Sequence, residues 1–225
     1  MYKKTILIVA AHPDDEILGC GGTVAKLAQE NDVYSLVLGE GVTSRDNKRQ
    51  LSKRKTDLAS LQNEMKKANK ILGVKQVFCA NLPDNRFDSV ALLDITKQVE
   101  KMIAKVNPTI IYTHYGKDLN IDHQMTYQAV LTATRPLPGN TVKEIFAFET
   151  VSSTEFNFPL SFSPDTFSDI DQWLDLKINA LAEYSEMRDF PHPRSLEFVK
   201  HVAKYWGVRV GLESAEAFQT VRKLW

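Results

Sequence analysis

The sequence has little that would connect it with disulfide chemistry, nucleic acid or membranes. Its two cysteines, Cys20 and Cys79, lie far apart without CxxC spacing, which predicts reduced, buried thiols in a cytoplasmic protein. Lysine plus arginine equals aspartate plus glutamate at 28 each, so no basic excess points to a nucleic-acid partner. No apolar run reaches the length of a membrane span, and the short run after Met1 lacks a signal-peptide cleavage site.

What the 225 residues do contain is a regular alternation of strand-like and helix-like segments. The expected strands are residues 5–10, 33–38, 76–80, 109–113 and 144–148, and the expected helices are 16–31, 45–72, 89–105 and 122–134. This order predicts an α/β fold with a doubly wound, Rossmann-like and mostly parallel sheet that carries helices on both faces.

The amino-acid composition changes after residue 150. A Ser-, Phe- and Pro-rich loop is expected at 151–164, followed by helices at 169–189 and 195–206. We therefore expect one domain over residues 1–225, with an α/β core at 1–150 and a helical C-terminal cap at 151–225.

The most informative segment is Ala11-His12-Pro13-Asp14-Asp15-Glu16, directly after the first apolar strand. Residues that follow a strand lie at its carboxyl end, where open parallel sheets bind their ligands. One imidazole and three carboxylates beside a buried strand are costly unless they bind something, and a divalent metal is the simplest explanation. The alternative is a set of acidic residues favoured by a helix N-terminus.

A second polar cluster, His114 to His123, follows the fourth expected strand, so both clusters should converge on one edge of the sheet. A catalytic zinc site needs three ligands from histidine and carboxylate side chains, which His12, Asp15 and His123 could supply. Asp14 would then remain as the base that activates water. The same ligand set suits ferrous iron, and a structural role is the alternative for each histidine.

A glycine-rich run, Gly19-Cys20-Gly21-Gly22, lies inside the first expected helix. It matches neither GxGxxG nor a phosphate-binding loop, because no Gly-Lys-Ser/Thr follows. The run therefore predicts close packing of this helix on the sheet or a bend beside the site.

The motif at 11–16, together with Asp122-His123, resembles the LmbE/PIG-L family of zinc-dependent N-acetylglucosaminyl de-N-acetylases over about the first 150 residues. The resemblance implies His12, Asp15 and His123 as metal ligands and Asp14 as general base. It also implies that Asp122 orients a neighbouring imidazole. The tail is similar to a branch of bacterial sugar deacetylases at residues 148–149, 152–154, 192–195 and 215–218.

The sequence departs from the family pattern at Asn120, where many members carry a histidine that is suggested as electrophile or acid. An asparagine can polarise an oxyanion but cannot deliver a proton to the departing amine. The proton would then come from Asp14 or from His192. An arginine that some members place before the second helix's glutamate is also absent, because Leu61 precedes Glu64 at that spacing.

The expected reaction is hydrolysis of the acetamide on a small-molecule amino sugar. Arg86 and Arg194 are the candidate substrate contacts, and the planar fork of Arg194 suits the phosphate of a nucleotide sugar. A surface charge is the alternative for each arginine. Further candidates for the sugar-facing surface are Asn85, Asp88, Phe156, Phe158 and Phe162, although core packing is favoured for the aromatic residues.

Three other functions compete with this prediction. An amidase acting on another amide conjugate would use the same site. A non-catalytic carbohydrate-binding protein is favoured by Asn120 and opposed by Asp14, because a binding module has little use for a base beside a metal. A nucleotidyltransferase is disfavoured because carboxylates stand where a phosphate needs positive charge. The sequence leaves open the sugar, the metal and whether the chain forms a homo-oligomer.

Overall fold

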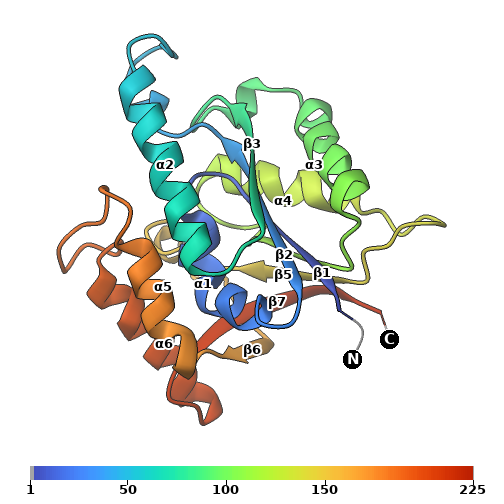
Figure 1. The fold of residues 1–225 in the computed structure, drawn as a ribbon, viewed down its shortest axis with the longest axis vertical. Coiled ribbons are helices and arrows are strands. Elements are labelled where there is room, and N and C mark those ends of the chain that lie inside the picture. The colour runs from blue at the N-terminus through green and yellow to red at the C-terminus, as the bar shows by residue number, and fades with distance from the viewer. Residues whose placement is uncertain (1–2, 225) are drawn as a thin grey trace.

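The computed structural model describes residues 3–224, in which seven strands form one mixed sheet in the order β3-β2-β1-β4-β5-β7-β6 (Figure 1). The strands are β1 (Thr5–Ala10), β2 (Asp32–Gly39), β3 (Gln76–Leu82), β4 (Ile110–His114), β5 (Glu144–Phe148), β6 (Thr166–Asp169) and β7 (Ala215–Lys223). The first five strands pair in parallel, and β7 pairs antiparallel with both β5 and β6. The prediction of a mostly parallel α/β sheet is confirmed.

Helices cover both faces of this sheet, as predicted. They are α1 (Asp15–Leu27), α2 (Lys55–Ile71), α3 (Leu92–Val106), α4 (Ile121–Ala133), α5 (Leu174–Leu181) and α6 (Leu196–Val210). One apolar core lies between the sheet and α1, α2, α5 and α6, and a second lies under α3 and α4 (Figure 1).

The composition of β1 agrees with its position in the middle of the five parallel strands. Every residue from Ile6 to Ala10 is fully buried, and each larger aliphatic side chain contributes about 1.5–3 kcal/mol to folding. β1 pairs with β2 on one side and β4 on the other, so the chain winds away from it in both directions. The carboxyl ends of β1 and β4 therefore form the switch point at which such sheets bind ligands.

The C-terminal cap is not wholly helical, and that part of the prediction is wrong. β6 and β7 add two antiparallel strands to the sheet, and the helix expected at 169–189 covers only Leu174–Leu181. Only the first four residues of β7 are buried, and its main partner β5 lies about 70 residues earlier, so its own sequence signals the pairing weakly.

The helix expected at 45–72 begins at Lys55, because residues 46–54 form a charged loop instead. In that loop the carboxylate of Asp46 accepts hydrogen bonds from Arg54 and Lys53, while Leu51, the one aliphatic residue, stays exposed. A helix here would have no apolar stripe to bury.

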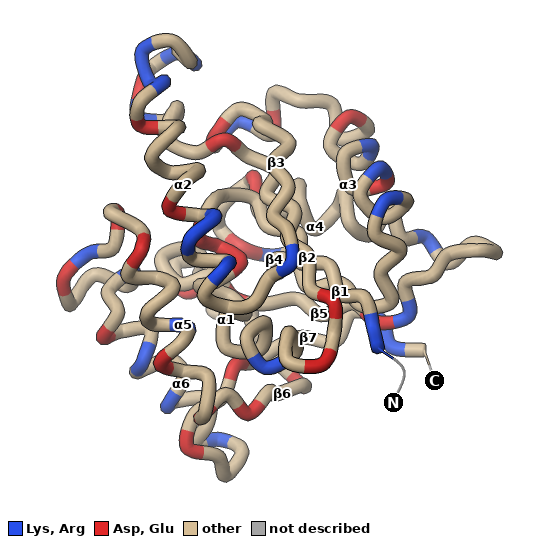
Figure 2. Tube along the Cα trace, viewed as in Figure 1, with Lys and Arg blue, Asp and Glu red and all other residues tan. Residues whose placement is uncertain are grey.

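The burial of the two cysteines follows the prediction in part. Cys20 is buried as expected, whereas the prediction is wrong for Cys79, which is exposed because β3 is an edge strand. Acidic and basic residues are interspersed along the chain (Figure 2). Across residues 3–224, no helix has the length and apolar character needed to cross a membrane.

Candidate metal centre

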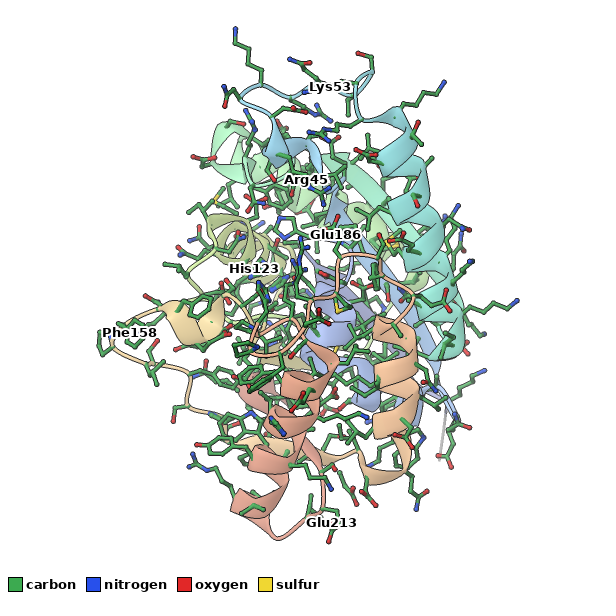
Figure 3. The ribbon with its side chains drawn as sticks, turned by 90° about the vertical axis from the view of Figure 1, so that its left-hand side faces the viewer. Arg45, Lys53, His123, Phe158, Glu186 and Glu213 are labelled. Atoms are coloured by element: carbon green, nitrogen blue, oxygen red, sulfur yellow. The ribbon has the colours of Figure 1, made fainter. Side chains whose placement is uncertain are left out.

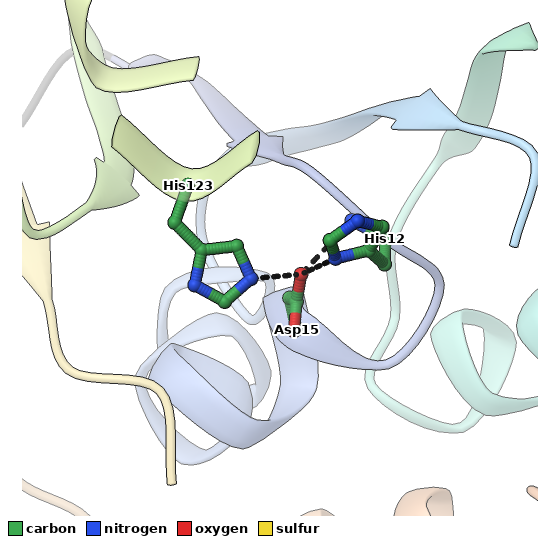
Figure 4. Close-up of side chains that lie close together, drawn as sticks. All are labelled: His12, Asp15 and His123. Atoms are coloured by element: carbon green, nitrogen blue, oxygen red, sulfur yellow. Dashed lines mark hydrogen bonds and ion pairs between the residues drawn. The ribbon is translucent and has the colours of Figure 1, made fainter. Parts of the chain in front are cut away.

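His12, Asp15 and His123 converge at the switch point. One potential ligand atom from each residue lies within 4.8 Å of the others. Asp15 Oδ2 lies 3.1 Å from His12 Nδ1 and 3.2 Å from His123 Nε2, so the carboxylate oxygen stands between two imidazoles (Figure 4). The convergence expected from the two separate motifs is present in the structure.

Local structure fixes each of the three side chains. His12 follows β1, and the tight turn to α1 places Asp14 in the left-handed region with φ 96°. Asp15 is the first residue of α1, and its Oδ2 also accepts a 2.9 Å hydrogen bond from the His12 amide. His123 lies in the first turn of α4, which begins where Asn120 Oδ1 accepts a hydrogen bond from the Asp122 amide.

A further carboxylate lies behind each imidazole. Asp122 Oδ2 is 3.0 Å from His12 Nε2, so it is within hydrogen-bond distance of the imidazole that it is expected to orient. Asp118 Oδ1 is 3.1 Å from His123 Nδ1, and Asp118 itself accepts hydrogen bonds from the hydroxyls of Ser153 and Thr154. Each ring therefore presents one nitrogen to Asp15 and the other to a carboxylate, the usual arrangement around metal-ligating histidines.

The donor set fits a zinc ion. Bonds of about 2.0–2.1 Å in a tetrahedron place neighbouring donors about 3.3 Å apart, close to the separations around Asp15.

The site also favours positive charge between these side chains. Burial acts to lower the pKa of His12, but hydrogen bonds with Asp122 and Asp15 raise it to about 10. A cation held between these groups would satisfy the same carboxylates.

Asp14 lies beside the centre, and its side chain faces an arginine. Its Oδ2 accepts a hydrogen bond from Arg194, while Oδ1 has no hydrogen-bond partner within residues 3–224. Burial raises the pKa of Asp14 to about 7, although the Arg194 guanidinium acts to lower it. A buried carboxylate that titrates near neutral pH suits proton transfer.

His114 packs beside the candidate centre and is not one of the three converging residues. Its Nε2 accepts a 2.8 Å hydrogen bond from the Ala11 amide, which leaves Nδ1 to donate to Thr150 Oγ1 at 3.1 Å. The ring stacks on His123 with centroids 3.9 Å apart, and burial lowers its pKa well below the usual value. His114 is therefore neutral, and its ring packs against one face of His123.

A cavity of about 260 Å³ opens in front of these groups. Its walls come from the segments that follow β1, β3 and β5, from the start of α4, and from the loops around 41–45 and 184–194. Arg45 and Glu186 form an ion pair between these two loops, above His123 in the view of Figure 3. The cavity is open enough, and polar enough, to admit a small polar molecule.

The structure brings only some of the predicted substrate contacts to this cavity. Arg194, Asn120 and Asn85 line it, and Asn120 Nδ2 donates a 2.8 Å hydrogen bond to Asn85 Oδ1. Arg86 donates instead to the Asp46 carbonyl and lies outside the lining. His192 is exposed, and its Nδ1 accepts a 3.0 Å hydrogen bond from the Arg194 amide.

Neither the aromatic candidates nor Asp88 lines the cavity. Phe162 packs edge-on against Tyr115, with ring centroids 5.2 Å apart. Phe156 and Phe158 are exposed, and Phe158 projects from the body of the molecule (Figure 3). Core packing therefore applies to Phe162 alone.

Sequence reasoning missed several groups of the site. Asp84 Oδ1 lies 3.6 Å from His12 Nε2, and its position just after β3 was a usable signal. Asp118 stood inside the second polar cluster without an assigned role. Arg45 and Glu186 carried no signal, because their pairing depends on how two distant loops meet.

Comparison with known proteins identifies relatives of this chain. The family model described as PIG-L, GlcNAc-PI de-N-acetylase, matches residues 7–134. The uncharacterized deacetylase YaiS of Escherichia coli is 30% identical over 189 residues, which cover 81% of this chain and 91% of that protein. A probable N-acetyl-α-D-glucosaminyl L-malate deacetylase 2 of Bacillus anthracis is 25% identical, with 81% of each chain covered.

A solved structure shares the fold over almost its whole length. The 4-carboxy-2-hydroxymuconate hydratase GalB of Pseudomonas putida superposes with a TM-score of 0.79 at 23% identity, covering 99% of this chain and 98% of that one. Because one fold can host different reactions, this likeness shows the fold alone.

Proposed function

Because this chain belongs to the PIG-L family of deacetylases, we propose that it is a zinc-dependent N-deacetylase that releases acetate from an N-acetylglucosamine-type sugar. The observation that carries the proposal is the position of Asp14. This buried carboxylate lines the cavity one residue from Asp15, beside the convergence of His12 and His123. A sugar-binding protein without activity would have no need for such a group.

In this proposal, His12, Asp15 and His123 hold the zinc ion. When bound, zinc supplies Lewis acidity, which makes a water acidic enough to lose its proton near neutral pH. Asp122 and Asp118 keep the two imidazoles in the orientation that ligation requires. Ferrous iron has the same preference for these donors, so both metals belong in the test.

Asp14 carries the proton through the reaction. It takes a proton from water as the water oxygen attacks the acetyl carbon, and it returns the proton to nitrogen as the C–N bond breaks. The products are acetate and the free amine of the sugar. The hydrogen bond from Arg194 holds one oxygen of Asp14 and leaves Oδ1 without a partner in residues 3–224, free for this transfer. We assign the acid role to Asp14 because His192 lies outside the cavity lining.

Asn120 polarises the carbonyl oxygen as negative charge develops on it. Its Oδ1 is engaged at the start of α4, and one N–H of Nδ2 donates to Asn85, which leaves the second N–H for the substrate. Removing one such donor typically costs about 10²–10³-fold in rate. A histidine at this position would add a proton donor, which Asn120 cannot replace.

The relatives and the polar lining of the cavity support the proposed substrate class. The Bacillus anthracis relative is named for a glucosaminyl malate, and the family model for a glucosaminyl lipid, so an N-acetylglucosaminyl conjugate is the common element. Arg194 lines the cavity and is the residue placed to meet an anionic group on such a conjugate.

The test is acetate release from free, malate-linked and nucleotide-linked N-acetylglucosamine by protein loaded with zinc or ferrous iron. Asp14→Ala is the matched variant, and protein treated with a chelator is the second control. Release that needs both the metal and Asp14 would support the proposal. Stoichiometric metal binding without release from any sugar would instead favour a different amide or a binding role.

A further inference from the structure

Helix α1 is broken in its middle. Cys20 has φ −147° and ψ 23°, which is not helical, so the helix consists of a short first part that begins at Asp15 and a second part that ends at Leu27. A break of this kind leaves carbonyl groups of the first part and amide groups of the second part without partners inside the helix.

Two buried charged residues from the C-terminal region supply those partners. Glu216 at the start of β7 accepts hydrogen bonds from the amides of Gly22 at 2.9 Å and Thr23 at 2.7 Å, one on each oxygen. Lys177 of α5 donates to the Leu18 carbonyl at 2.8 Å and to Glu216 Oε1 at 2.6 Å. Both residues are only 4% exposed.

The glycines beside the break allow the helix to pack closely on its neighbours. A Cβ atom on Gly19 would stand 2.1 Å from Cδ2 of Phe148, and one on Gly22 would stand 2.9 Å from Cβ of Ile170. The helix therefore approaches β5 on one side and the segment before α5 on the other. The predicted bend and the predicted close packing are both present.

The break lies one turn from the metal centre. Leu18, whose carbonyl Lys177 holds, is three residues after Asp15, and the amide of Leu18 donates to the Asp14 carbonyl at 2.8 Å. This turn is therefore fixed at one end by Lys177 and at the other by the contacts of Asp15 with His12 and His123. Any shift of the turn would move Asp15 Oδ2 relative to the two imidazoles.

We propose that Lys177 and Glu216 are positioning residues for the metal centre, which act by fixing the first turn of α1. The inference rests on the proposed function, because it assumes that Asp15 is a metal ligand. Neither residue lines the cavity in front of the centre, so neither is expected to touch substrate. Both lie outside residues 7–134, so the region after the family match helps to build the site.

The first experiment measures zinc affinity, by competition with a chelator, for the wild type and for Glu216→Gln. Glutamine keeps the shape of the glutamate side chain, but its NH₂ group would face one of the two backbone N–H groups. Two donors cannot form a hydrogen bond with each other. We expect zinc to bind about 10-fold more weakly, as for other residues that orient metal ligands. The matched control is Ile95→Ala, which disrupts the core under α3 on the opposite face of the sheet and should leave zinc affinity unchanged.

The outcomes separate this inference from the proposed function. If the wild type binds no metal, the proposed metal centre fails first. If the wild type binds zinc and Glu216→Gln binds it equally well, the positioning role is overturned. If Glu216→Gln does not fold, zinc affinity is measured for the double variant Lys177→Gln/Glu216→Gln, which removes both charges and keeps hydrogen-bonding groups. Zinc affinity equal to that of the wild type would overturn the positioning role.

A measurement on the unmodified protein gives an independent answer. Coupling between two sites is reciprocal, so zinc should also stabilise the contacts of the Gly22 and Thr23 amides with Glu216. We expect zinc to slow hydrogen exchange at these two amides by about 10-fold more than at amides of α3. Equal slowing in both regions would show that the two sites are not coupled and would overturn the inference.

Discussion

Two clusters of buried charge lie at opposite ends of the first turn of α1, and they differ in how completely they are paired. The Lys177–Glu216 cluster is closed, since both carboxylate oxygens and the ammonium group have hydrogen-bond partners. The metal-centre cluster opens to a cavity and holds more carboxylates than cations, and Asp14 Oδ1 has no partner within residues 3–224.

The difference shows how buried charge can be interpreted. Burying a charge is costly in either cluster, so each needs compensation. In the closed cluster the compensation is internal, and its effect is on the backbone of α1. In the open cluster Asp14 Oδ1 has no hydrogen-bond partner within residues 3–224, and a cation held by the three proposed ligands would add compensation. Incomplete pairing beside a cavity therefore distinguishes a ligand site from a structural ion pair.

The largest expected effect comes from removing Asp15, a proposed metal ligand in the open cluster. Asp15→Ala would leave the two imidazoles without the oxygen between them, so we expect loss of stoichiometric zinc. Acetate release should fall by about 10³-fold or more, since a bound metal contributes several kcal/mol to the transition state. Metal analysis and acetate assays check this, with the exposed His201→Ala as control. Full zinc content in Asp15→Ala would contradict the assigned site.

Asp14→Asn should separate chemistry from metal binding inside the same cluster. The amide keeps an acceptor for Arg194 but cannot take a proton, so acetate release should fall by about 10²–10⁴-fold. Zinc affinity should stay within a few-fold of the wild type, because Asp14 is not one of the converging ligands. Retention of more than a tenth of the activity would exclude Asp14 as the base.

The open cluster could largely be predicted from the sequence, for a physical reason. His12 and Asp15 are neighbours in the chain, and His123 joins them because the ends of adjacent parallel strands meet. Sequence patterns report such local groupings and this topological rule. Local sequence patterns also predict β1 and β5 at the bounds that the structure shows.

The closed cluster could not be predicted, because its members meet only through the register of β7 against β5 and the packing of α5. Glu216 lies 194 residues from Gly22, and Lys177 lies 159 residues from Leu18. The same reason applies to Arg45 and Glu186, which come from loops 141 residues apart. Long-range pairing between single residues leaves no periodic signal in one sequence.

Lys177→Met tests whether the closed cluster supports the fold more strongly than the open one does. Removing the ammonium leaves Glu216 buried without its cation, so we expect a loss of about 3–5 kcal/mol in the free energy of unfolding. Arg194→Met should cost only about 1 kcal/mol, because Asp14 faces a cavity and can take up a proton. Urea unfolding at pH 7 compares the two variants. Similar losses would remove the distinction between the clusters.

The smallest expected effect is the pH dependence of stability that arises from Glu149. This partly buried carboxylate lies beside the closed cluster and has no cation within ion-pair distance in residues 3–224. It accepts a hydrogen bond from the Trp206 indole, and burial raises its pKa from 4.5 to about 7. The folded protein therefore holds this proton more tightly than the unfolded chain does, so its contribution to stability is complete below pH 4.5 and is lost as the pH rises through about 7.

The full shift corresponds to roughly 3 kcal/mol, and contact with solvent reduces our expectation to about 1–2 kcal/mol between pH 5 and pH 8. Glu149→Gln removes the titration and keeps an acceptor for Trp206. The variant should therefore match the wild type at pH 5 and exceed its stability at pH 8. Chemical unfolding at both pH values measures this difference. A variant that is less stable than the wild type at pH 8 would show that ionised Glu149 has a compensating partner, so that the closed cluster extends beyond Lys177 and Glu216.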